Sequence, residues 1–328
     1  MLEELLPGFY KIEVPLPNTP LRALNAYFVA GDSRNLLIDN GFNHPECAAA
    51  LNMALDTLNV DLANTDFFLT HSHSDHNGLT ASLLRSSSSK IMCSKDDGEH
   101  INAAILHDDY WQDMLDVLLS HGFPRNELDE LCSRHPGRTY SPPVALDITA
   151  VRDGDQLNYG MYSFTVIETP GHTPGHLTLY EPANRIFISG DHILDSISPN
   201  ITHWPGIKDS LGDYLKSLDK ISMVEIDRTF PAHRGLINDT STRIAELKNH
   251  HKKRLDEAYT VLEQYGPLSA YDTASHMKWA LKGATWEQFK VSQKCFATGE
   301  AISHLVHLQT LDRVKSGMAG GITLFYPV

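Results

Sequence analysis

The sequence has little positive charge and few cysteines. Its 328 residues include 27 Lys and Arg against 41 Asp and Glu, which gives a formal net charge of −14. Nucleic acids and anionic membrane surfaces attract proteins with a positive field, so this balance argues against both as partners. The four cysteines form no C-x-x-C pair, which argues against a thiolate zinc site or a disulfide framework and fits a reducing cytoplasm.

Long apolar runs are also missing. No stretch approaches the roughly 18 apolar residues that a membrane span requires. The N-terminal MLEELLPGFYKIEV has two glutamates and no basic residue before Lys11, unlike a secretory signal. There is no G-x-S-x-G nucleophile motif. Because 41% of the residues are hydrophobic, a substantial core is available. From the charge, the cysteines and the missing signal together, we expect a cytoplasmic protein that acts on a small molecule.

Hydrophobic patterning indicates strands early in the chain and again in its middle. A hairpin is predicted over residues 25–41, a helix over 44–60, and further strands at 66–70, 148–172 and 176–193. Between them, residues 94–142 have the pattern of helices, predicted over 101–124 and 125–135. We interpret residues 94–142 as a helical insertion.

The C-terminal region differs in pattern and charge. Residues 241–328 predict helices followed by a final hairpin, and they carry 11 basic and 8 acidic groups. The first 240 residues carry 16 basic and 33 acidic groups, a balance of −17. We therefore expect a catalytic domain over residues 1–240 and a mostly helical module over residues 241–328.

The stretch FFLTHSHSDHNG, residues 67–78, gathers metal-ligand side chains where a predicted strand ends. His71, His73 and Asp75 follow one another at a spacing of two residues, which directs side chains to one side of an extended chain, and His76 comes next. Imidazole and carboxylate are the usual ligands of zinc and similar metals. Without a cation these groups would repel and desolvate one another, so the stretch predicts part of a metal site.

Three further candidates follow later apolar runs. They are His172 in ETPGHTPGH, Asp191 in FISGDHI and His233 in RTFPAHRG. Because each follows a predicted strand, the strand ends can converge at one edge of the fold. We expect these residues to complete the site.

These seven positions resemble the pattern of the metallo-β-lactamase superfamily, HxHxDH followed by His, Asp and His. The resemblance covers residues 10–240 and implies an αββα sandwich with two divalent metal ions at one edge. It implies that His71, His73 and His172 bind the first ion. It implies in the same way that Asp75, His76 and His233 bind the second and that Asp191 bridges them. The ligand types fit zinc, which we expect, and also accept iron or manganese.

Other branches of that superfamily differ at single positions. The commonest zinc β-lactamases have cysteine where Asp191 stands, and flavodiiron-type reductases have glutamate where His73 stands. Homoserine-lactone lactonases usually have a tyrosine soon after the bridging aspartate, whereas HILDS is found here. The sequence is most similar to the glyoxalase II-like branch, and its C-terminal region resembles the winged-helix-like module appended to some members.

The resemblance implies hydrolysis of a thioester or ester of a small acyl substrate. Two cations about 3.5 to 4 Å apart lower the pKa of a bridging water toward 7, which provides hydroxide as nucleophile, and Asp75 is the candidate catalytic group that orients it. Alternatives are a phosphodiesterase or ribonuclease, a lactone hydrolase, a mononuclear iron persulfide dioxygenase, and a binding protein with little turnover.

Other residues have two interpretations each. His176 and His192 are expected to support ligands or to pack, and Asp39 is expected either to orient a ligand or to form a turn. The apolar stripe of the insertion forms a lid over the site or packs on the domain; its members are Ile105, Tyr110, Trp111, Met114, Leu115, Leu118 and Leu119.

Substrate contacts are predicted at two places. His203 and Trp204 are candidates for the pocket rim. In the basic run NHHKKRLDEA, the candidates are His251, Lys252 and Arg254, for a phosphate or carboxylate of a thiol carrier such as coenzyme A or glutathione. The alternative for this run is a solvated helix face. The last helix has apolar residues at helical spacing, which suits docking on the catalytic domain or on a second subunit, that is, a homodimer.

Overall fold

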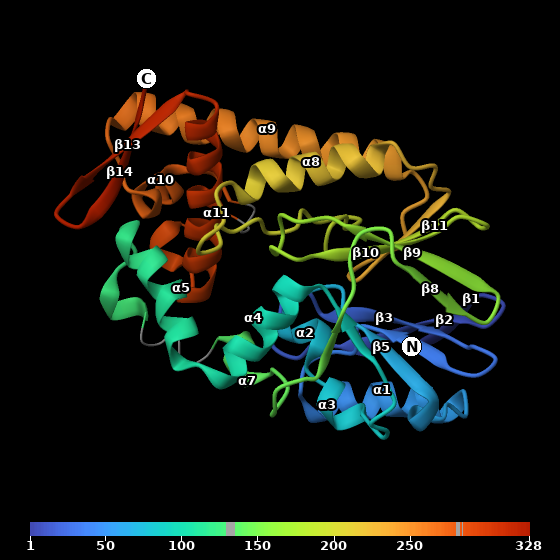
Figure 1. Ribbon diagram of the computed structural model, residues 1–328. Helices are drawn as coiled ribbons and strands as arrows, with labels where there is room; N and C mark the ends of the chain where they lie inside the picture. Colours follow the sequence, from blue (N-terminus) through green and yellow to red (C-terminus); the bar gives the residue numbers. More distant parts are fainter. Residues whose placement is uncertain (129–134, 280–282, 284) are drawn as a thin grey trace.

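The computed structural model describes residues 1–128, 135–279, 283 and 285–328. Two β-sheets pack face to face, and a layer of helices covers the outer face of each (Figure 1). α8 and α9 lie over the sheet that contains β9, β10 and β11, and α1 and α3 lie under the sheet that contains β2, β3 and β5 (Figure 1). The αββα sandwich predicted from the sequence is confirmed.

The first sheet has seven strands in chain order, with β1, β2, β3 and β4 antiparallel and β4 through β7 parallel. Its strands are β1 (Leu2–Leu6), β2 (Phe9–Pro15), β3 (Ala23–Val29), β4 (Asn35–Ile38), β5 (Thr65–Phe68), β6 (Ile91–Cys93) and β7 (Ile148–Ala150). The second sheet has the order β12-β11-β10-β9-β8. Its strands are β8 (Gln156–Tyr159), β9 (Tyr162–Glu168), β10 (Leu177–Glu181), β11 (Ile186–Gly190) and β12 (Arg228–Pro231).

The helices include short turns and two long C-terminal elements. They are α1 (Pro45–Thr57), α2 (Ser74–Asn77), α3 (Thr80–Leu83), α4 (Lys95–Leu106), α5 (Asp108–Ser120), α7 (Pro136–Thr139), α8 (Ser210–Ser222), α9 (Thr240–Tyr265), α10 (Ala270–His276) and α11 (Val291–Thr310). Short 3₁₀ turns occur at Leu62–Asn64 and Trp286–Gln288, and β13 (Val314–Ala319) and β14 (Ile322–Pro327) form a final hairpin.

Alternating side chains explain why the sheets are covered on both faces. In β3, Tyr27 and Val29 lie in the cluster between the sheets, whereas Ala26 and Phe28 lie in the cluster beneath the first sheet. Successive residues of a strand point to opposite faces, so an apolar residue at every position requires cover on both sides. The predicted hairpin over residues 25–41 is β3 and β4, which pair in the antiparallel sense.

The helical insertion is broken where the sequence predicted one continuous helix. α4 ends at Leu106 and α5 begins at Asp108, because His107 has an extended backbone with φ −127° and ψ 115°. Asp108 and Asp109 then occupy the first turn of α5, where acidic groups stabilise a helix start. Most of the predicted helix over 125–135 lies outside the described residues.

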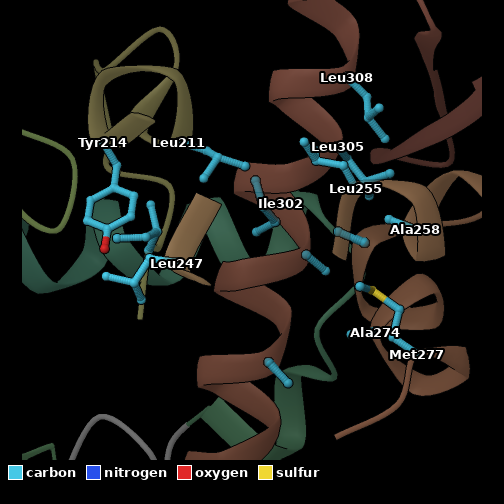
Figure 2. Close-up of a cluster of buried hydrophobic side chains, with 14 of the residues drawn as sticks. Leu211, Tyr214, Leu247, Leu255, Ala258, Ala274, Met277, Ile302, Leu305 and Leu308 are labelled. Atoms are coloured by element: carbon cyan, nitrogen blue, oxygen red, sulfur yellow. The ribbon is translucent and has the colours of Figure 1, made fainter. Parts of the chain in front are cut away.

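The C-terminal helices pack around α11. Figure 2 shows Leu305 of α11 beside Leu255 of α9, and Ile302 and Leu308 of α11 belong to the same cluster. The same cluster includes Leu211 and Tyr214 of α8, together with Phe187 of the second sheet. The residues after 240 therefore share a core with the sandwich. Helices followed by a hairpin is the predicted order. The division into two domains at residue 240 stays a prediction.

Among the described residues, no helix is both long and apolar enough to cross a membrane.

Candidate metal centre

The seven predicted ligands converge at one edge of the sandwich. His71 and His73 follow β5, and α2 carries Asp75 and His76. The other three stand just after strands of the second sheet; they are His172 after β9, Asp191 after β11 and His233 after β12. α2 lies at the edge that faces α4 and α11 (Figure 1). Residues separated by up to 162 positions in the sequence thus meet because strands of both sheets end there.

The first group of donors consists of three imidazoles. Nδ1 of His73 lies 3.0 Å from Nε2 of His71 and 3.0 Å from Nε2 of His172. A tetrahedral ion with bonds of about 2.0 Å separates its ligands by about 3.3 Å. The three nitrogen atoms are therefore spaced as ligands of one ion would be.

The second group combines carboxylates and imidazoles. Nε2 of His233 lies 3.4 Å from Oδ2 of Asp75, and Nε2 of His76 lies 3.7 Å from that oxygen. Asp191 connects the two groups, since its Oδ1 lies 3.4 Å from His233 Nε2 and its Oδ2 lies 3.5 Å from His172 Nε2. Each oxygen of Asp191 therefore faces a different group, as a bridging carboxylate would.

Hydrogen bonds fix which nitrogen of each ring faces the site. Nδ1 of His76 lies 2.7 Å from Asp39 Oδ2, Nδ1 of His172 lies 2.8 Å from the carbonyl oxygen of Asn200, and Nδ1 of His233 lies 2.8 Å from that of Ala23. With Nδ1 occupied, Nε2 is left as the ligand atom. Asp39 therefore orients a ligand, which was one of its two interpretations, and it also accepts from Thr70.

Burial and charge both fit a cation. His76 Nε2, His233 Nε2 and Asp191 Oδ1 are buried and have no hydrogen-bond partner among the described residues. Burial opposes protonation of His76, but Asp39, Asp75 and Asp191 outweigh it and raise the pKa of His76 to about 10. The surrounding carboxylates thus favour positive charge at this point. Such donors suit a divalent metal, and their role as ligands is a proposal that rests on this geometry.

His71 and His73 differ electrostatically from His76. Burial, followed by the neighbouring imidazoles, lowers the pKa of His71 and His73 well below the usual value. Both rings are therefore neutral near pH 7, and a neutral imidazole is the form that binds metal.

Asp97 is a candidate positioning residue that sequence analysis missed. It is fully buried in the first turn of α4. Its Oδ2 accepts hydrogen bonds from the amide of Ser72 (2.9 Å) and the hydroxyl of Thr173 (2.6 Å), and its Oδ1 accepts from the amide of Gly175 (2.8 Å). Burial raises the pKa of Asp97, while these bonds favour its ionised form. One carboxylate thus joins the loops that carry His71 and His172.

The two neighbouring histidines have different environments. His176 accepts a hydrogen bond at Nε2 from the amide of Asp191 (3.1 Å), and its Nδ1 lies 2.9 Å from Thr169 Oγ1, so it supports a candidate ligand. Both ring nitrogens of His192 are buried without a partner among the described residues. Burial lowers the pKa of His192 to about 3, and its ring packs against Tyr214.

Trp204 lies at the candidate centre. Its ring is stacked on His73 with centroids 6.1 Å apart, and its Nε1 donates to the carbonyl oxygen of His172 at 3.0 Å. The ring of His100 also contacts Trp204, with centroids 5.1 Å apart, and the ring of Tyr110 contacts that of His100. His203 is half-buried, with no hydrogen-bond partner for Nδ1 among the described residues. Substrate contact by His203 and Trp204 stays a prediction.

The basic run in α9 is placed differently from the predicted site entrance. His251 is buried, and its Nδ1 lies 3.2 Å from Nε2 of His304 in α11. Arg254 is buried too, and it donates to Glu257 and Glu300. Lys252 is exposed. Two of the three side chains thus have partners inside the C-terminal module, while His251 Nε2 and Arg254 Nη2 have none among the described residues. Binding of a phosphate or carboxylate by this run stays a prediction.

Most of the apolar stripe of the insertion packs on the protein. Leu115, Leu118 and Leu119 pack in the hydrophobic cluster around α11, and Ile105 packs against the cluster beneath the first sheet. Trp111 is buried and donates to the carbonyl oxygen of Ala104. This arrangement favours packing over a lid for these members of the stripe.

Comparison with known proteins identifies the family. Residues 19–233 match the model of the Metallo-beta-lactamase superfamily, so the chain belongs to that superfamily. A probable metallo-hydrolase of Bacillus subtilis (strain 168), YqjP, is 26% identical over 325 residues, 96% of each chain. The atrochrysone carboxyl ACP thioesterase of Aspergillus fumigatus is 22% identical over 260 residues, which cover 78% of this chain and 49% of that protein.

A solved structure supports the same assignment. A metallo-beta-lactamase family protein from Thermus thermophilus has a TM-score of 0.83 and 26% identity, covering 99% of this chain and 100% of its own. The similarity thus extends through the C-terminal helices. Membership of the superfamily, together with the donor set described above, makes the chain a metallo-hydrolase.

Proposed function

We propose that the protein hydrolyses a thioester or ester of a small acyl substrate at a site with two divalent metal ions. The observation that carries the proposal is the paired donor set, in which the two oxygens of Asp191 face two separate groups of ligands. Zinc is the expected metal, because imidazole and carboxylate ligands suit it, and iron or manganese would also fit.

The chemistry that such a metal pair supplies when bound is a water molecule of lowered pKa and polarisation of a carbonyl oxygen. Asp75 is the proposed catalytic group among the chain's own residues. Burial alone would raise its pKa, but His76 and His233 outweigh burial and lower it well below the usual value. The carboxylate therefore stays ionised at neutral pH, and it can accept a hydrogen bond from water and orient its oxygen.

The surroundings favour an acyl group with an apolar or aromatic part. Trp204 lies against His73, and half-buried His100 and Tyr110 extend this wall of rings away from the ligands. The name of the A. fumigatus relative, an ACP thioesterase, supports a thioester. The excess of acidic residues in the first 240 positions opposes a polyanionic substrate such as RNA.

We also infer a small-molecule partner and a cytoplasmic location. Among the described residues, Cys47, Cys93 and Cys295 are free thiols, which fits a reducing compartment. The possible homodimer stays a prediction.

The test combines metal analysis with a substrate panel. Purified protein is analysed for metal content by mass spectrometry and assayed on acyl-thioesters, esters, lactones and a phosphodiester, alongside His73→Ala. His276→Ala is the matched control, because this exposed histidine of α10 lies outside the candidate site. Two metal ions per chain and thioester or ester cleavage that is lost only in His73→Ala would support the proposal.

Other outcomes would overturn the substrate assignment. Cleavage confined to the phosphodiester would indicate a phosphodiesterase, and cleavage confined to lactones would indicate a lactonase. One iron ion per chain without hydrolysis would indicate the dioxygenase alternative.

A further inference from the structure

Residues 195–209, which belong to the loop between β11 and α8, contact two of the candidate metal ligands, His172 and His73. The carbonyl oxygen of Asn200 lies 2.8 Å from Nδ1 of His172. Trp204 donates from Nε1 to the backbone oxygen of His172 at 3.0 Å, and its ring covers His73. The position of His172 is therefore fixed at its ring and at its backbone by this one loop.

The loop contains no helix or strand, and one face of α11 anchors it. The hydroxyl of Ser303 donates to the carbonyl oxygen of Ile201 at 2.5 Å. Nδ1 of His307 lies 2.9 Å from Oδ2 of Asp209, at the end of the loop. The α11 residues with contacts to the loop are spaced three or four positions apart, except for the adjacent pair Gly299 and Glu300, which places them on one side of the helix. They are Phe296, Gly299, Glu300, Ser303, His307 and Thr310.

Gly299 shows how closely the helix and the loop approach each other. A Cβ atom at this position would lie 2.3 Å from Oγ1 of Thr202 and 3.3 Å from its Cβ. Any larger residue would push the loop outward or force Thr202 to move. Ile201 is fully buried and belongs to the same hydrophobic cluster as Ile302 and Leu305 of α11. Ile302 and Leu305 belong to the cluster in Figure 2, which also contains residues of α8, α9 and α10, so α11 packs against these neighbouring helices.

The second donor group has no such dependence on α11. The ring of His76 is oriented by Asp39, which follows β4, and the ring of His233 by the carbonyl oxygen of Ala23 in β3. Both supports belong to the first sheet. A change in α11 therefore acts on the first group, through His172 and His73, before it reaches the second.

We infer that α11 is a positioning element for the first metal subsite, with Ser303 and Gly299 acting through the loop at residues 195–209. The C-terminal module then contributes to metal binding even though none of its residues is a candidate ligand. The inference rests on the proposed binding of two metal ions, but it is independent of the substrate.

Ser303→Ala and Gly299→Ala test the inference, and Ser292→Ala is the control. Ser292 is exposed on the same helix, so its replacement makes the same chemical change away from the loop. The proteins are stripped with a chelator and titrated with Zn²⁺ and Co²⁺, and the visible absorption of bound Co²⁺ reports the ligand geometry. Circular dichroism and the thermal midpoint of the metal-free proteins check the fold.

We expect Ser303→Ala to bind one of its two ions about 10-fold to 100-fold more weakly, with a changed Co²⁺ spectrum, while the other ion binds as in the parent. Ser292→Ala should match the parent, and Gly299→Ala should show the same pattern more strongly. If Gly299→Ala does not fold, the milder Ser303→Ala still decides the question.

Two results would overturn the inference in different ways. Equal weakening of both ions, or unchanged binding of both, in folded Ser303→Ala would refute a positioning role while leaving the proposed function intact. A parent protein that binds fewer than two ions would refute the two-metal site and, with it, this inference.

Discussion

Asp97→Asn tests whether one buried carboxylate joins the two loops that carry the candidate ligands His71 and His172. The substitution preserves the size of the side chain and replaces one acceptor oxygen by an NH₂ group. All three groups that face the carboxylate are donors, namely the amides of Ser72 and Gly175 and the hydroxyl of Thr173. Whichever way the amide turns, its nitrogen faces at least one backbone N–H.

The less costly orientation places the new nitrogen at Oδ1, where it faces only Gly175. A hydrogen bond to a charged group contributes about 1.5–3 kcal/mol, and an unpaired buried donor costs about 1–3 kcal/mol. The lost hydrogen bond and the unpaired donor describe partly the same effect, so the two costs do not simply add. We therefore expect Asp97→Asn to lower the free energy of unfolding by roughly 2–4 kcal/mol. Metal affinity should fall about 10-fold to 100-fold, as when the partners of metal ligands are removed.

Urea unfolding of the metal-free protein and metal titration measure these two effects. Asp96→Asn is the matched control, because Asp96 is exposed in the same helical turn and its loss should cost only about 0.3–1 kcal/mol through the helix dipole. If Asp97→Asn is no less stable than Asp96→Asn and binds metal normally, the carboxylate does not hold the loops.

Three further substitutions test other parts of the molecule. Asp66→Asn removes the ion pair with Arg34 (2.6 Å) and should cost about 1–3 kcal/mol at pH 7. Burial would raise the pKa of Asp66, but Arg34 and the other hydrogen-bond donors outweigh it and place the folded pKa below 3.8. The stabilisation is therefore present above pH 3.8 and is lost as the pH falls through the folded pKa, so urea unfolding should show a smaller deficit for Asp66→Asn in acid. Gly171→Ala should lower the expression and the thermal midpoint sharply, because φ is +137° and a Cβ would lie 2.4 Å from Cα of Tyr214. Leu247→Ala, in the cluster of Figure 2, should cost about 2–5 kcal/mol in urea unfolding and leave metal stoichiometry unchanged.

The convergence of the candidate ligands could be predicted from the sequence because each follows a local signal. His71, His172 and Asp191 come within four residues of the ends of short strands, and strands that end at one edge bring such residues together. The αββα sandwich followed from the resemblance of these positions to the superfamily pattern. These features depend on spacing along the chain, which is visible without coordinates.

Asp97 could not be predicted in this way. It is one of two adjacent aspartates at the start of a helix, where acidic residues are common. Its partners lie 25, 76 and 78 residues away, and nothing in the local pattern distinguishes it from exposed Asp96. The surroundings of the basic run in α9 could not be predicted either, because they depend on a neighbouring helix. Helical periodicity does not show that His251 and Arg254 point into a neighbouring helix.

The shared core also bears on the predicted division at residue 240. α8 precedes that position, yet Leu211 and Tyr214 of α8 lie in the same cluster as Leu247 of α9 and Ile302 of α11. Removing the residues after 240 would expose this face of α8 and leave the second sheet without part of its outer layer. It would also release the loop that fixes His172. The charge difference that marks residues 241–328 as separate therefore describes their surface, whereas their apolar side chains belong to the same core that supports the candidate metal centre.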